Sequence, residues 1–196
     1  MDRRDLKELH FITLIENVPS IVQHCILSHK RAAKLPHGSV AMQAIQERRK
    51  LVVVPGARSL HEYANLYICA RNPMLYKRQS QHRELCVLRI STGVLDLNGA
   101  IVTDGNAASS YTRFAQAPQG LAIVNRDWTF AEFWTDPDPI QKWRKTAAKC
   151  AEVLVPDRVH PRYLTGAYVS CKEALAKFDS LNTDLAASID GHLFFR

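Results

Sequence analysis

Glu152 is the acidic residue whose position most suggests chemistry. It lies in the apolar run AEVLVP (151–156), which is typical of a buried strand, and it follows a basic stretch that contains Lys142, Arg144, Lys145 and Lys149. A buried carboxylate costs free energy unless it is paired or used. Glu152 therefore either stabilises a developing positive charge in a reaction or forms an ion pair with a neighbouring lysine at the edge of a sheet.

Two adjacent arginines, Arg48 and Arg49, lie near the end of the expected helix AMQAIQERRK (41–50). A guanidinium group donates two parallel hydrogen bonds to the oxygens of a phosphate or a carboxylate, so the pair suits phosphate recognition. Cations are also common at the C-terminal end of a helix because they complement its dipole. A solvated basic face is therefore the alternative interpretation.

Aromatic and basic residues are interleaved in YANLYICARNPMLYKR (63–78). Tyrosines beside cations suit stacking on nucleobases or on a nicotinamide ring, and packing in the core is the alternative for some of them. The polar segment TDGNAASSYTRF (103–114) follows an expected strand, which is a frequent place for a functional loop.

Strands and helices must position these candidates. Apolar runs and turn signals predict strands at 9–15, 66–70, 85–91, 151–156, 164–170 and 192–196, helices at 19–27, 41–50, 137–149 and 171–181, and a basic loop at 29–40. The strands do not alternate regularly with helices, which favours an α+β fold over a repeated βαβ unit. The length predicts a single domain over residues 1–196. Neither GxGxxG nor GxxxxGK[ST] occurs, so a bound dinucleotide would not lie on a Rossmann half.

The composition favours a polyanionic partner. The formal net charge is +7, and neutralising phosphates with basic side chains releases counterions. The five cysteines form no CxxC pair, so they predict neither a disulfide framework nor a zinc site. No apolar stretch is long enough to cross a membrane. We therefore expect a protein of the reducing cytoplasm that holds no metal.

Taken in order, these segments resemble the DarT family of toxin ADP-ribosyltransferases, which transfer ADP-ribose from NAD to a base in DNA. The resemblance rests on FITLIENVPSI (11–21), IQERRK (45–50), LYICARNPMLY (66–76), DGNAASSYTRF (104–114) and AEVLVPDRV (151–159). Five motifs in one order are far more specific than any one of them. The resemblance implies an ADP-ribosyltransferase-like split, curved β-sheet with flanking helices and an NAD cleft between its halves.

The resemblance also implies roles for individual residues. Glu152 would be the catalytic glutamate and Arg49 the essential arginine. The residues that would line the NAD cleft are His10, Phe11, Thr13, Asn17, Tyr67, Arg71 and Met74. Those that would contact single-stranded DNA are Tyr76, Arg78, Lys142, Trp143, Arg144 and Lys145, the last four within a loop and helix at 135–150 that would present the target base.

Phe11 departs from the family pattern, because thymidine-modifying members usually carry His or Arg there, and Leu14 replaces a second family histidine. His10 could substitute if the strand is shifted by one residue. The change favours the branch that modifies guanine, with thymine as the other target.

The family implies a toxin whose partner is an antitoxin ADP-ribosyl hydrolase of the macrodomain type. Two other functions stay open: an ADP-ribosyltransferase-fold enzyme that acts on RNA or protein, and a non-catalytic module that binds nucleic acid.

Overall fold

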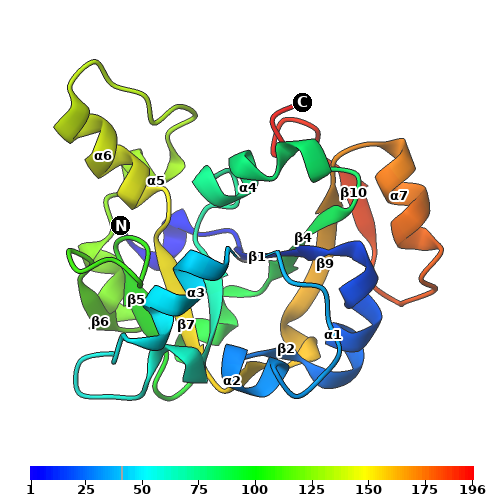
Figure 1. Ribbon diagram of the computed structural model, residues 1–196, viewed down its shortest axis with the longest axis horizontal. Helices are drawn as coiled ribbons and strands as arrows, with labels where there is room; N and C mark the ends of the chain where they lie inside the picture. Colours follow the sequence, from blue (N-terminus) through cyan, green and yellow to red (C-terminus); the bar gives the residue numbers. More distant parts are fainter. Residues whose placement is uncertain (41) are drawn as a thin grey trace.

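The computed structural model describes residues 1–40 and 42–196, and in this part of the chain an eight-stranded sheet forms the centre (Figure 1). The strand order is β10-β9-β4-β1-β3-β7-β5-β6, and only β10 and β9 run parallel. The strands are β1 (Leu9–Leu14), β3 (Tyr63–Tyr67), β4 (Leu85–Ile90), β5 (Ile101–Thr103), β6 (Phe114–Gln116), β7 (Glu152–Pro156), β9 (Leu164–Val169) and β10 (Ala187–Ile189). A small second sheet pairs β2 (Ile26–Leu27) with β8 (Arg158–Val159).

The large sheet is split in its middle. β1 pairs with β4 from Leu9 to Leu14, whereas the register of β1 with β3 contains one pair, His10 with Tyr67. On the other side of the split, β3 pairs with β7 along its whole length. The sheet therefore consists of two half-sheets, β10-β9-β4-β1 and β3-β7-β5-β6, which meet at one pair of residues.

Helices flank both half-sheets. They are α1 (Val18–His24), α2 (His29–Ala32), α3 (Gln43–Lys50), α4 (Pro73–Lys77), α5 (Arg126–Phe130), α6 (Pro139–Ala148) and α7 (Lys172–Asp179). Figure 1 shows α5 and α6 at the end of the sheet that carries β5 and β6, and α7 beside β10 at the other end. The start of α6 follows from its sequence, because the Asp138 side chain accepts the N–H of Ile140 and proline occupies the first turn.

Alternating residues of the central strands bury both faces of the sheet. In β4, Leu88 and Ile90 pack into the main core, while Leu85 and Val87 pack on the opposite face against Phe194. A strand that is buried on both faces consists mainly of apolar residues, and the sequence of β4, LCVLRI, has this character.

The α+β class and the split sheet are confirmed, but several predicted elements have different bounds or a different structure. The terminal residues 192–196 form no strand; they turn back so that Phe194 fills the core, and the edge strand is β10 instead. The strand predicted at 66–70 lies earlier, in β3.

Two differences concern the N-terminal helices. The helix predicted at 19–27 ends at His24, because Cys25 has a φ of 83°, a value outside the helical region. The expected basic loop at 29–40 begins with the short helix α2. The helix predicted at 41–50 is present as α3, and Ala41 lies outside the described residues.

Candidate active site

Glu152 and Arg49 lie in direct contact, although 103 positions separate them in the sequence. The guanidinium of Arg49 donates from Nη1 to Oε1 and from Nη2 to Oε2 of Glu152, both at 3.1 Å. The side chains are 6% and 0% exposed. Burial opposes the charge on Arg49, but the carboxylate of Glu152 outweighs this effect and raises the pKa of the guanidinium. The two charges therefore form a buried, bidentate ion pair.

The strands fix the position of Glu152. It is the first residue of β7 and lies opposite Tyr67 of β3 on one side and Thr103 of β5 on the other. Its N–H donates to Oγ1 of Thr103 at 3.1 Å, and this hydroxyl donates to the carbonyl of Gly105 at 2.8 Å. Arg49 comes from the last turn of α3, which brings its guanidinium to the head of β7.

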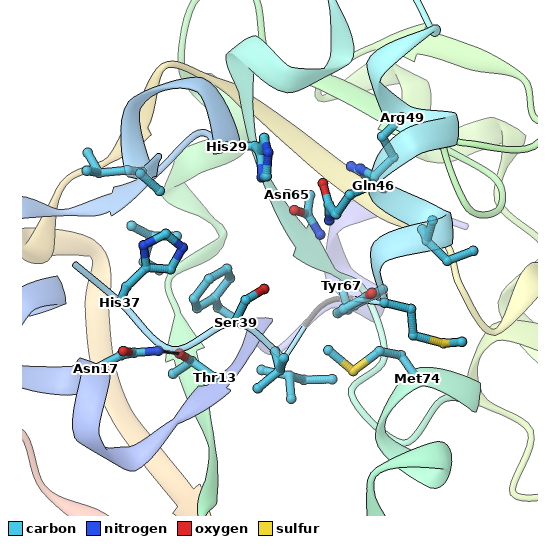
Figure 2. Close-up of a pocket in the computed structure, with 18 of the residues that line it drawn as sticks. Thr13, Asn17, His29, His37, Ser39, Gln46, Arg49, Asn65, Tyr67 and Met74 are labelled. Carbon is cyan, nitrogen blue, oxygen red and sulfur yellow. Dashed lines mark hydrogen bonds between the residues drawn. The ribbon is translucent and has the colours of Figure 1, made fainter. Parts of the chain in front are cut away.

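A cavity of about 360 Å³ lies between the two half-sheets, lined by residues of β1, β3 and the helices α1 to α4 (Figure 2). Of the residues predicted to line an NAD cleft, it contains Phe11, Thr13, Asn17, Tyr67 and Met74, and Arg49 lines it as well. Glu152 is fully buried and lies behind this wall, in contact with Arg49. The volume falls within the range of small-molecule sites.

Asn17 fastens a loop to the wall of the cavity. Its Nδ2 donates to the carbonyl of Gly38 at 2.7 Å and to Oγ1 of Thr13 at 3.1 Å, and its Oδ1 accepts the N–H of Gly38 at 3.1 Å. At the other side of the cavity, burial and then the nearby carboxylate of Glu152 raise the pKa of Tyr67. Tyr67 therefore lines the cavity as a neutral phenol.

The structure does not bring His10 and Arg71 to the cavity. Because side chains alternate along a strand, His10 points away from the face of Phe11, and its Nε2 lies 3.4 Å from Oε1 of Glu8. Arg71 donates from Nη1 to the carbonyl of His192 at 2.6 Å, and its guanidinium lies 4.0 Å from the centre of the Phe195 ring. A role for either residue in NAD binding stays a prediction.

Glu8 is the centre of a separate polar cluster on the sheet. It accepts a hydrogen bond from Nε of Arg89 at 2.7 Å, in addition to its contact with His10. Burial disfavours the ionised carboxylate, but the hydrogen bonds of His10, Arg89 and Tyr168 outweigh burial and lower the pKa of Glu8 to about 2. This cluster fastens the start of β1 to β4.

The predicted DNA-binding residues lie on two exposed surfaces. On α6, Lys142, Trp143 and Arg144 are exposed, whereas Lys145 forms an ion pair with Asp136 at 2.7 Å. The ring of Trp143 meets that of Tyr111 edge to face, with centroids 5.3 Å apart.

The second surface lies around α4. Tyr76 is 47% exposed and packs edge to face against Trp134 and Phe195. Arg78 is half-buried and donates to the side chain of Gln81 at 3.2 Å. Trp134 connects this surface to the segment that precedes α6.

Lys149 is a buried cation whose environment the sequence did not reveal. It is 1% exposed; its Nζ donates to the carbonyl of Ala131 at 2.8 Å and to Sγ of Cys69 at 3.3 Å. The amine also lies 5.8 Å from the centre of the Trp134 ring. Lys149 therefore holds the segment before α6 against the end of β3, close to Glu152.

Sequence reasoning missed several polar residues that line the cavity, among them His29, His61 and Gln46. Gln46 lies one helical turn before Arg49, and the spacing of i to i+3 places both on one face of α3. That signal was available. The two histidines lie in α2 and in the 3₁₀ turn η3 (Leu60–Glu62), where no periodic pattern marks a residue as facing a cavity.

Among the described residues, no His, Cys, Asp and Glu side chains form a group of three or more that could hold a metal ion. None of the helices seen in residues 1–40 and 42–196 has the length and apolar character needed to span a membrane.

Known proteins resemble the chain along nearly its whole length. A "DNA ADP-ribosyl transferase-DNA ADP-ribosyl glycohydrolase fusion protein" of Thermosipho africanus is 34% identical over 203 residues, which cover 96% of this chain and 50% of the relative. The solved structure of Thermosipho africanus DarTG in complex with ADP-ribose has a TM-score of 0.83 and 31% identity, and covers 97% of this chain and 51% of that one. The chain thus spans about half the length of this relative.

A second solved structure aligns with this chain over almost the whole length of both proteins. Thermus sp. 2.9 DarT in complex with ADP-ribosylated ssDNA has a TM-score of 0.79 and 25% identity, over 95% of each chain. The family model described as "DarT: ssDNA thymidine ADP-ribosyltransferase, DarT" matches residues 10–193. This match spans both half-sheets and both members of the buried ion pair, so the chain belongs to the DarT family.

Proposed function

We propose that this protein is an NAD-dependent mono-ADP-ribosyltransferase that modifies a base in single-stranded DNA. The observation that carries the proposal is a buried ion pair between the half-sheets, in which Arg49 lines the cavity and Glu152 lies directly behind it. Two relatives support it: one is solved with ADP-ribose and the other with ADP-ribosylated ssDNA. NAD is therefore the substrate that donates the ADP-ribose.

The proposed reaction breaks the bond between C1′ of the ribose and the nicotinamide nitrogen, and nicotinamide leaves with the bonding electrons. The ribose then carries oxocarbenium-like positive charge, which an adjacent carboxylate stabilises. Glu152 has this role, and it accepts a hydrogen bond from a ribose hydroxyl. A nitrogen of the target base bonds to C1′, and its proton passes to Glu152 as the general base.

Arg49 serves this chemistry in two ways. Its two hydrogen bonds fix the plane of the Glu152 carboxylate, and its position at the cavity wall suits the binding of the NAD pyrophosphate. Tyr67, as a neutral phenol opposite Glu152, stacks near the nicotinamide. Phe11, Thr13, Asn17 and Met74 complete the proposed NAD site.

The exposed residues of α6 are the proposed contact for the DNA strand. Lys142 and Arg144 neutralise phosphates, and Trp143 stacks on a base. Single-stranded DNA presents unstacked bases, so no duplex has to be opened to reach them. Lys149 places Trp134 and the segment before α6 next to the reacting centre.

The target base is proposed to be thymine, because the description of the matching family names thymidine. The replacement of the family histidine by Phe11 favours guanine, and this stays a prediction. The Thermosipho relative joins its transferase to a glycohydrolase, which supports a partner enzyme that removes ADP-ribose and a role of this chain as the toxin of the pair. A single domain over residues 1–196 and a cytoplasmic location stay predictions as well.

The test incubates the protein with NAD and an oligonucleotide, and measures the mass of the oligonucleotide and the release of nicotinamide. The acceptors are DNA strands with one thymine or one guanine, the matching RNA, a protein mixture and no acceptor. Modification of DNA that disappears in Glu152→Gln and persists in Glu173→Gln, an exposed glutamate of α7, supports the proposal. Modification of RNA or protein alone favours the second enzyme class, and DNA binding without nicotinamide release favours a non-catalytic module.

A further inference from the structure

Residues 131–138, between α5 and α6, form neither a helix nor a strand and lead into the helix proposed to contact the DNA strand. Figure 1 shows α6 and this segment extending away from the sheet. The carbonyl of Ala131 accepts a hydrogen bond from Nζ of Lys149 at 2.8 Å, and Lys149 lies three residues before Glu152. The segment therefore begins close to the proposed reacting centre, and the contacts that follow Ala131 decide where it places α6.

Two residues of the C-terminal turn, residues 191–196, contact the 131–138 segment. The ring of Phe195 meets the ring of Trp134 edge to face, with centroids 5.9 Å apart and an interplanar angle of 87°. Nε2 of His192 lies 3.1 Å from Oε1 of Glu132. These two polar side chains are 65% and 56% exposed, so water screens their interaction. Phe195 and Trp134 are both half-buried, and their rings therefore make the stronger contact.

The C-terminal turn is fastened to the rest of the molecule next to this contact. Phe194 is 1% exposed and packs in the core. Nη1 of Arg71 donates to the carbonyl of His192 at 2.6 Å, and the guanidinium of Arg71 lies 4.0 Å from the centre of the Phe195 ring. The ring of Phe195 therefore has a fixed position, against which Trp134 packs.

The backbone of Phe195 indicates that surrounding contacts impose this position. Its φ is 65°, in the left-handed region, which suits glycine and is unfavourable for a residue with a bulky side chain. Such a conformation persists only where neighbouring contacts determine it, and it is most frequent near functional sites. Here the neighbours are Arg71, Trp134 and Tyr76, whose ring centroid lies 5.1 Å from that of Phe195.

We infer that Phe195 is a positioning residue for the DNA acceptor: by fixing Trp134, its ring holds the 131–138 segment and α6 where a base can reach the ribose beside Glu152. This inference rests on the proposed function, since it takes α6 as the DNA contact. A misplacement of about 1 Å can reduce a rate about 100-fold, so the hold on this segment matters for transfer. The residues that line the cavity in the described part of the chain do not include Phe195. Its loss should therefore impair the use of DNA and leave NAD binding intact.

The test measures kcat/KM for a single-stranded oligonucleotide at saturating NAD, and KM for NAD at a saturating oligonucleotide concentration. Phe195→Gly removes the ring and introduces the residue that adopts a φ of 65° without strain, so the turn keeps its backbone. An edge-to-face pair contributes about three- to tenfold to an equilibrium, so kcat/KM for the oligonucleotide should fall by about this factor. KM for NAD and the Kd of ADP-ribose should each change less than about twofold. Phe195→Tyr keeps the ring and should match the wild type.

A double variant distinguishes positioning from a general loss of structure. Trp134→Ala should also lower kcat/KM for the oligonucleotide, and it tests the same contact from the other side if the turn does not tolerate glycine. Adding Phe195→Gly to Trp134→Ala should lower it no further, because both substitutions remove one contact, whereas independent effects would multiply. Tyr163→Ala is the matched control. Tyr163 is half-buried and its ring centre lies 5.1 Å from the guanidinium of Arg162, and both kinetic constants should stay at wild-type values.

Oligonucleotide binding without NAD provides a measurement that needs no turnover. If α6 is less well placed, a smaller fraction of the protein is ready to bind the strand, and the apparent Kd rises by the same factor. Anisotropy titrations of a fluorescent oligonucleotide should therefore show a Kd about three- to tenfold higher for Phe195→Gly and unchanged for Tyr163→Ala.

The possible outcomes separate this inference from the proposed function. Wild-type kcat/KM for the oligonucleotide in Phe195→Gly, an equal rise in KM for NAD, or multiplied effects in the double variant each overturn the inference while DNA modification stands. If the wild type modifies no DNA, the proposed function fails, and the Kd for the oligonucleotide still decides whether Phe195 positions α6. If the wild type does not bind the oligonucleotide, both are wrong.

Discussion

Removing one member of the Arg49–Glu152 pair should destabilise the fold strongly. The side chains are 6% and 0% exposed, so Arg49→Met leaves a buried carboxylate, and Glu152→Leu leaves a largely buried guanidinium, each without its counter-charge. Breaking a buried ion pair in this way costs about 3–5 kcal/mol. For a chain of this size, 1 kcal/mol corresponds to about 2–4 °C in Tm, so each single variant should melt roughly 6–20 °C below the wild type.

The double variant Arg49→Met/Glu152→Leu should recover most of this loss, because an apolar pair of similar volume carries no charge to bury. The coupling energy from the double-mutant cycle should therefore reach about 3 kcal/mol. Catalysis should not recover, because the proposed reaction needs the carboxylate. Stability and activity should thus separate in one variant.

Urea unfolding followed by circular dichroism measures all four proteins. The exposed pair of Arg3 and Asp96, with side chains 41% and 56% exposed and an N–O distance of 2.7 Å, is the matched control. Its cycle should give less than about 1 kcal/mol. A Glu152→Leu protein as stable as the wild type, or a buried cycle no larger than the exposed one, would refute the assignment of a dry, tightly coupled pair.

Three other predictions concern separate parts of the molecule. Trp143→Ala and Tyr111→Ala should each weaken the binding of a fluorescent single-stranded oligonucleotide about tenfold, since stacking contributes about 1–3 kcal/mol per base; unchanged anisotropy titrations contradict this. Asn17→Leu should raise the Kd for ADP-ribose about tenfold in calorimetry, because it removes the bonds that hold Gly38 at the cavity; equal affinity means the loop is placed without them. The pKa of Glu8 is lowered to about 2 in the folded state, so its contribution to stability is complete above pH 4.5 and is lost as the pH falls towards 2. The free energy of unfolding of Glu8→Gln, measured with urea, should therefore lack this loss at low pH. The same pH profile for the variant and the wild type would contradict the assignment.

The sequence predicted the proposed catalytic pair, Arg49 and Glu152, because both residues lie in motifs that resemble those of the DarT family. The apolar runs of β4 and β7 also predicted buried strands, since burial on both faces leaves little room for polar residues. The end of α1 at His24 was not predictable in the same way. It depends on the backbone of Cys25, whose positive φ is rare for a residue with a side chain.

Other features depend on contacts between distant segments. The apolar residues in 192–196 resemble a strand in sequence. In the structure they form no strand, and Phe194 packs in the core beside β4. His29, Gln46 and His61 share one cavity only because the fold brings α2, α3 and η3 together. Sequence patterns report the local environment of a residue, and neither feature is local.

The single residue pair that joins β1 to β3 links ligand affinity to the rigidity of the molecule. Among the described residues, the register across this joint contains only His10 and Tyr67, so backbone hydrogen bonds contribute little to holding the half-sheets at a fixed separation. A dinucleotide that contacts both β1 and β3 would connect the two strands where few backbone hydrogen bonds join them. By thermodynamic linkage, a ligand present at 100 times its Kd adds about 2.7 kcal/mol to the free energy of unfolding. Amide hydrogens on both sides of the joint should therefore exchange more slowly once the substrate bridges it.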